Sequence, residues 1–138
     1  MTPKLFRILL ASSLLSAALG SGIDYLFPNL VPQPLATALE AIEQPDWAVH
    51  PAFLWLIVVF LVVAGGASVI GLFRFSSWAP KLALAFSVIL FILQPFSGVA
   101  VVSGLSMALN DLSASLWGAV LLAAFFSQVK EHFSNVPR

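Results

Sequence analysis

The sequence predicts an all-α integral membrane protein, a four-helix bundle with short amphipathic segments on its outer side. Two observations lead to this prediction. Of the 138 residues, 60% are hydrophobic and only 9% are charged, with a mean hydropathy of +1.02, whereas about a quarter of the residues in soluble domains are charged. In addition, residues 52–73 form an uncharged run of 22 residues, which as a helix covers roughly 33 Å and crosses a bilayer core of about 30 Å.

Three further apolar stretches predict helices that pack with residues 52–73 in a single membrane domain, residues 1–138. The four helices are expected at about 4–27, 52–73, 80–97 and 111–129. The connection between the second and third is a short turn, so these two are expected to be antiparallel neighbours. Pro95 removes a backbone donor from the third helix and predicts a bend at its outer end.

The first helix also resembles a secretory signal, with a basic start, an apolar centre and small residues at 18–20 where a signal peptidase cuts. The apolar character continues through Tyr25, Leu26 and Phe27, an aromatic end suited to the membrane interface. We therefore expect an uncleaved helix, with a cleaved signal as the alternative.

The connection between the first two helices contains five prolines in residues 28–51, which exclude one continuous helix. Leu35, Leu39 and Ile42 nevertheless occur at i, i+4 and i+7. This spacing predicts a short amphipathic helix over about 35–43 on the outer membrane surface, with an ordered loop turn as the alternative.

A second outer segment is expected at about 103–110. Ser103 is a suitable N-cap for a helix there. That helix either lies along the outer interface or bends at Asn110 and Asp111 into the fourth helix.

Basic and acidic residues separate along the chain. The basic residues lie before the first helix, between the second and third, and after the fourth: Lys4, Arg7, Arg74, Lys81, Lys130 and Arg138. All acidic residues except Glu131 fall at the opposite side of the predicted bundle. Because cytoplasmic connections carry an excess of Lys and Arg, both termini are expected in the cytoplasm, which requires an even number of spans.

Small residues mark the helix faces that are expected to pack closely. They recur at a spacing of four in the first and fourth helices and cluster in the second: Ser12, Ser16, Gly20, Gly65, Gly66, Gly71, Ala119 and Ala123. Such residues let helix backbones approach in a membrane. We expect the second-helix glycines to pack against the Ser12 stripe, with a hinge or an unwound ion site at Gly65 and Gly66 as the alternative.

The outer side gathers a polar cluster that could in principle bind a cation: Asp24, Glu43, Asp46, His50 and Asp111. The cluster has no recognisable ligand spacing, so no metal site is expected. The chain has no cysteine, and no motif of a nucleophile, P-loop or zinc site occurs. We therefore expect a protein that is not an enzyme, holds no cofactor and binds no nucleic acid.

Residues 71–79 (GLFRFSSWA) and 103–113 (SGLSMALNDLS) resemble motifs of small bacterial four-helix membrane proteins that have no assigned activity. The resemblance implies a four-span protein of the bacterial inner membrane. It implies no catalytic or ligand-binding residue.

The leading functional hypothesis is an inner-membrane protein that acts by association, as a homo-oligomer or as an accessory subunit of a membrane complex. Its partners would be the lipid bilayer and other membrane proteins. The alternative is a small multi-copy transporter or channel, with pore-lining groups among Gln94, Ser16, Ser68 and Ser127. A membrane enzyme remains possible only where a partner supplies the catalytic groups.

Overall fold

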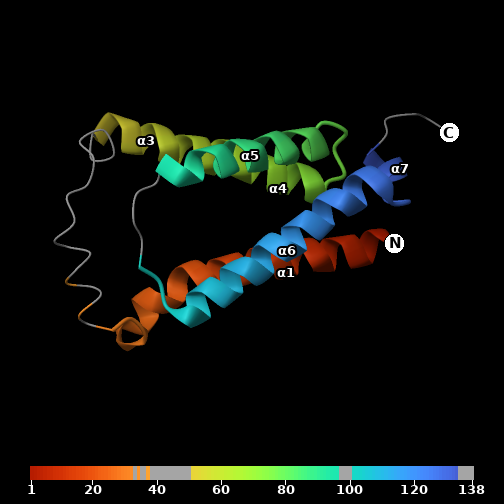
Figure 1. Cartoon of the computed structure of the whole chain (residues 1–138). Helices are drawn as coiled ribbons and strands as arrows, with labels where there is room; N and C mark the ends of the chain where they lie inside the picture. The colour runs from red at the N-terminus through yellow and green to blue at the C-terminus, as the bar shows by residue number, and fades with distance from the viewer. Residues whose placement is uncertain (33, 35–36, 38–50, 97–100, 134–138) are drawn as a thin grey trace. The chain divides into compact units, whose positions relative to one another are not determined.

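The structure is a computed structural model that describes residues 1–32, 34, 37, 51–96 and 101–133. All regular secondary structure in these residues is helical (Figure 1), which confirms the all-α class. The expected amphipathic helix at 35–43 falls almost entirely outside the described residues, as do Glu43, Asp46 and His50.

Three helices are long and apolar enough to cross a membrane: α1 (Pro3–Leu26), the stretch Trp55–Phe73, and α6 (Gly104–Phe126). The fourth expected helix is shorter. Helix α5 covers Ala79–Leu93 and continues as a 3-10 turn, η3 (Gln94–Phe96). Pro95 has no N–H to continue the α-helical ladder, and the α-helix gives way to the 3-10 turn at Gln94, one residue before it. The described residues thus contain three span-length helices and one shorter apolar helix, and a four-helix bundle is not established.

The second apolar segment is helical throughout but not uniform. It comprises α3 (Pro51–Phe60), a five-residue π-helical segment η2 (Leu61–Gly65), and α4 (Gly66–Phe73). Both Gly65 and Gly66 keep right-handed helical dihedral angles, with φ of −64° and −60°. The chain is therefore not unwound at the glycines, although the π-helical segment changes which residues share a face on either side of it.

The expected boundary at Asn110 and Asp111 is absent, because α6 runs without a break from Gly104 to Phe126. Of the two alternatives for residues 103–110, the structure agrees with the one in which they lead into the fourth helix, which begins at Gly104 and has no break at Asn110 and Asp111. Neither Asn110 nor Asp111 removes a backbone donor as proline does, so polarity alone does not end the helix. As a result Asp111 lies two turns inside α6 rather than at its end.

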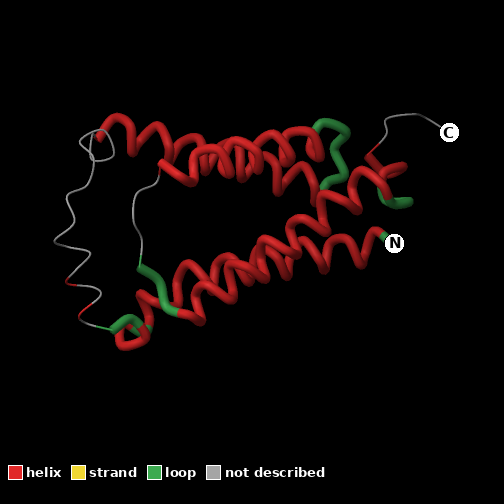
Figure 2. Tube along the Cα trace, in the orientation of Figure 1, coloured by secondary structure: helices red, strands yellow, loops and turns green. Residues whose placement is uncertain are grey.

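The chain forms two compact units. One contains Met1–Phe6, Gln44–Gly98 and Leu121–Arg138, and the other contains Arg7–Glu43 and Val99–Val120. In the first, α4 and α5 are joined by a short turn, drawn in green in Figure 2, and lie side by side. In the second, α1 and α6 run antiparallel. A 3-10 turn, η1 (Pro28–Leu30), follows α1. A short helix, α7 (Lys130–Phe133), follows α6.

Candidate functional site

The α1–α6 pair is joined by serine hydroxyls that reach across to the backbone of the opposite helix. Ser13 Oγ donates to the Ser113 carbonyl at 3.1 Å, and Ser113 Oγ donates to the Ser13 carbonyl at 2.9 Å. Both serines are buried. Because each hydroxyl reaches the other helix's main chain, the two backbones must be close, which small residues allow.

Two turns further along α1, at Gly20, the contact between the two helices is closer still. Ser106 Oγ donates to the Gly20 carbonyl at 2.6 Å. A Cβ at Gly20 would lie 2.6 Å from Asn110 Oδ1 and 3.1 Å from the Asn110 backbone nitrogen. A glycine is therefore required at position 20, because α1 and α6 approach each other closely there. This geometry agrees with the predicted place of Gly20 on a packing face.

The N-terminus of α6 is capped from two directions. Ser103 Oγ accepts the Ser106 N–H at 3.1 Å, as expected for its predicted role as N-cap. Asp24 of α1 accepts the Ser103 N–H through Oδ2 at 2.9 Å. A carboxylate at this position also complements the positive end of the α6 dipole. The other oxygen, Asp24 Oδ1, is buried and has no hydrogen-bond partner in the described part of the chain.

We call this set of contacts the polar seam: Ser13, Gly20, Asp24, Ser103, Ser106 and Ser113. A strict spacing of four does not find it. Its α1 members, Ser13, Gly20 and Asp24, lie on a face whose positions follow alternating steps of three and four, from Leu10 through Ser13, Ala17 and Gly20 to Asp24. That alternation is the mark of two helices packed at a shallow angle, and it is the signal that would have located the seam from the sequence.

The other unit contains an aromatic cluster of Phe6, Phe75 and Phe133. The ring centroids are 5.6 Å apart for Phe6 and Phe75, 5.7 Å for Phe6 and Phe133, and 5.1 Å for Phe75 and Phe133. The tilted and edge-on geometries are those that aromatic rings favour. The cluster joins the start of α1, the α4–α5 turn and α7, three segments that each carry basic residues in the sequence.

Phe75 adopts a positive φ of 55°. Ser76 N–H donates to the Gly71 carbonyl at 2.9 Å and Phe75 N–H to the Leu72 carbonyl at 3.2 Å, the pattern of a Schellman helix end. Glycine is the usual residue at this position, since a side chain there costs about 1–2 kcal/mol. The contacts of the Phe75 ring with Phe6 and Phe133 account for a phenylalanine here.

The three glycines of the second segment have different surroundings. A Cβ at Gly71 would lie 2.7 Å from the Ala79 Cβ and 2.9 Å from the Trp78 ring, and one at Gly65 would lie 3.1 Å from the Phe86 ring. These neighbours belong to α5 and the turn before it, not to the expected Ser12 stripe. A Cβ at Gly66 would meet nothing within 4 Å, so the contact expected of Gly66 is not found.

The remaining residues that were predicted to lie on packing faces differ in their burial. Ala123 is buried, Ser16 is half-buried, and Ser12 and Ala119 are exposed. The neighbour of Ser12, Ser13, is buried and contacts Ser113 of α6, not the second-helix glycines that were expected to pack against the Ser12 stripe. Two of the proposed pore-lining serines instead bond their own helices: Ser68 Oγ donates to the Ala64 carbonyl at 2.7 Å, and Ser127 Oγ to that of Ala123 at 2.6 Å.

The two described members of the outer polar cluster do not converge. Asp24 accepts a hydrogen bond from the backbone N–H of Ser103, the N-cap of α6. Asp111 is exposed and lies eight residues beyond Ser103, about 12 Å along the helix axis. Among the described residues no group of three or more His, Cys, Asp or Glu side chains could hold a metal ion.

The hydroxyls of Ser13, Ser106 and Ser113 donate to backbone carbonyls of the opposite helix, so these contacts hold α1 and α6 together. The geometry defines an all-helical protein with three helices suited to crossing a membrane. No family model, no curated relative and no solved structure matches the chain.

The reciprocal bond of the polar seam leads to a stability prediction. We expect Ser13→Ala and Ser113→Ala each to lower the free energy of unfolding by about 0.5–1.5 kcal/mol, because interhelical hydrogen bonds in membranes contribute about this much. Reversible unfolding of the purified protein in mixed micelles measures it. Ser12→Ala is the matched control and should leave the value unchanged. An equal loss at Ser12 would show that the face of α1 is assigned incorrectly.

Proposed function

We propose that the chain is a four-span protein of a bacterial inner membrane that acts by association, as a homo-oligomer or as an accessory subunit of a membrane complex. The observation that carries this proposal is the incomplete cover of α6. Only 11% of its most apolar 18-residue stretch is buried within the chain, while the serines on its covered side bind α1. Within its own compact unit α6 is covered by α1 on one side, which leaves surface for lipid and for other helices.

The fourth span in this proposal is α5 with η3. Its 15 α-helical residues and three 3-10 residues extend about 28 Å, close to the thickness of a bilayer core. The aromatic cluster supports this assignment. Since Phe6, Phe75 and Phe133 contact one another, α5 must carry the chain back across the membrane before α6 can return to the cluster.

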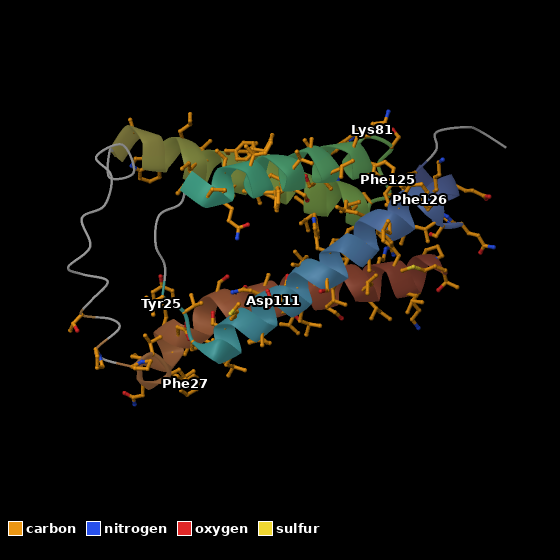
Figure 3. The ribbon with its side chains drawn as sticks, in the orientation of Figure 1. Tyr25, Phe27, Lys81, Asp111, Phe125 and Phe126 are labelled. Atoms are coloured by element: carbon orange, nitrogen blue, oxygen red, sulfur yellow. The ribbon has the colours of Figure 1, made fainter. Side chains whose placement is uncertain are left out.

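The orientation follows from the same cluster. The cluster brings together Phe6, Phe75 and Phe133, which lie close in the sequence to the basic residues Lys4, Arg74 and Lys130. Positively charged connections are retained in the cytoplasm, so we place both termini and the α4–α5 turn on the cytoplasmic side. Aromatic residues at the far end of α1, Tyr25 and Phe27 (Figure 3), suit the opposite interface.

The association is tested by purifying the full chain from its own membranes in a mild detergent. We expect a protein mass above the 14.8 kDa of one chain, either as a multiple of it or together with another membrane protein. Native mass spectrometry, which removes the detergent, measures this mass. A single chain without a companion, obtained in several mild detergents, would contradict the proposal.

The topology is tested separately. The chain has no cysteine, so single cysteines at Thr37, Ser76 and Asn135 each report one location. An impermeant thiol reagent added to intact cells is expected to label the Thr37 variant alone. Labelling at Ser76 or Asn135 before the cells are opened would refute the proposed orientation.

A further inference from the structure

Three exposed basic residues mark the ends of the three span-length helices: Lys4, Arg74 and Lys130. The first lies in the first turn of α1, the second directly follows α4, and the third is four residues beyond the end of α6. We call this set the basic rim. At the end of a helix that crosses a bilayer, a lysine or arginine side chain extends to the level of the lipid headgroups.

The aromatic cluster holds the three segments of the basic rim together. Each member of the rim is within three residues of a ring of the cluster, and the ring centroids of Phe6, Phe75 and Phe133 are between 5.1 and 5.7 Å apart. The rim and the cluster belong to the same compact unit. The three helix ends therefore lie together on one side of the bilayer, and their positive charges are concentrated there.

The described residues of the chain leave this charge without a partner. Among them, no side-chain hydrogen bond or ion pair is formed by Lys4, Arg74 or Lys130. The described part of the same unit has one further basic residue, Lys81, and one acidic residue, Glu131. Four basic residues and one acidic residue give this part of the unit an excess of positive charge.

Exposed apolar side chains lie next to the basic rim. Leu5, beside Lys4, is 53% exposed, and Ile70, about one turn before Arg74 in α4, is 56% exposed. Both belong to the same unit as the rim. The surface therefore combines positive charge at the level of the headgroups with apolar side chains that suit lipid acyl chains.

We infer that the basic rim binds the headgroup phosphate of an anionic phospholipid. Lysine and arginine donate charge-assisted hydrogen bonds to phosphate oxygens, and basic groups beside membrane helices recognise anionic headgroups. A phospholipid also supplies acyl chains for Leu5 and Ile70, which a soluble acidic protein or a nucleic acid does not. Binding of this lipid requires only the three span-length helices and the aromatic cluster, so it is independent of the proposed association.

Lipid binding is tested with the purified full-length chain in micelles of a neutral detergent. Phosphatidylglycerol and phosphatidylcholine with identical acyl chains are added in separate titrations, and native mass spectrometry counts the lipids bound to the chain. We expect half-saturation at an about tenfold lower mole fraction of phosphatidylglycerol than of phosphatidylcholine. Inorganic phosphate at the same concentration should not displace the lipid, because it has no acyl chains.

Charge variants locate the site. Arg74→Gln and Lys130→Gln are each expected to lower the preference for phosphatidylglycerol about threefold, and the triple variant with Lys4→Gln to abolish it. Lys81→Gln is the matched control, since it removes one charge outside the basic rim, and it should keep the preference. Phe133→Leu keeps every charge but removes a ring of the cluster, and it should also lower the preference. Unfolding in micelles shows that each variant is folded.

Equal half-saturation by the two lipids would overturn the inference. A loss in Lys81→Gln as large as that in Arg74→Gln would also overturn it, because net charge alone would then attract the lipid. Displacement by inorganic phosphate would show that the site takes a free anion instead of a lipid, with the same consequence. A single chain that prefers phosphatidylglycerol would contradict the proposed association and leave the lipid site in place, and an oligomer without the preference would do the reverse.

Discussion

Phe6→Ala is expected to lower the free energy of unfolding by about 3–5 kcal/mol, the usual cost of removing a buried phenylalanine. The side chain is 0% exposed and its ring contacts both Phe75 and Phe133. Alanine would leave a cavity at the point where the start of α1, the α4–α5 turn and α7 meet. Unfolding in mixed micelles measures the loss.

The adjacent Leu5 provides the control, since its side chain is 53% exposed and Leu5→Ala should cost little. Phe133→Ala is expected to be nearly as damaging as Phe6→Ala, and the double variant should cost less than the sum, because residues in contact are coupled. Strict additivity of the two substitutions would show that the rings do not act as one cluster.

Gly71→Leu is expected to destabilise the α4–α5 hairpin by about 1–3 kcal/mol, the usual range for overpacking a tight contact. The nearest atom to a new Cβ is the Ala79 Cβ at 2.7 Å. This atom is attached directly to the backbone and cannot rotate away, so the helices must separate. A lower melting temperature of the detergent-solubilised protein would report the separation.

Gly66→Leu is the matched control, because it introduces the same side chain into the same helix where a Cβ meets nothing within 4 Å. Its melting temperature should be unchanged. Equal losses at Gly66 and Gly71 would mean that the cost comes from the helix backbone and not from contact with α5.

The sequence correctly predicted features that depend on local chemistry. The run at 52–73 is helical because it is apolar and free of proline, and α5 ends near Pro95 because proline lacks the N–H that continues a helix. Ser103 caps α6 because a serine side chain can accept an N–H of the first turn wherever the helix lies. These predictions need no knowledge of a neighbouring helix.

Other features were mispredicted or missed because they depend on the rotation of one helix against another. Ser12 and Ser13 are adjacent and chemically identical, yet only Ser13 reaches α6, since the pair packs along alternating steps of four and three. In the same way Gly65 and Gly66 are adjacent, and only Gly65 lies against Phe86. A spacing of four alone does not distinguish such neighbours.

The amino-acid sequence by itself determined that this protein is helical and strongly apolar, and where its basic residues lie along the chain, since these properties follow from composition and local backbone chemistry. The tertiary structure decided which side chains meet. The three phenylalanines at positions 6, 75 and 133 form one cluster although they are far apart in the chain. The continuity of α6 placed Asp111 within a helix instead of at its end, because a helix persists through polar residues when its backbone hydrogen bonds remain intact.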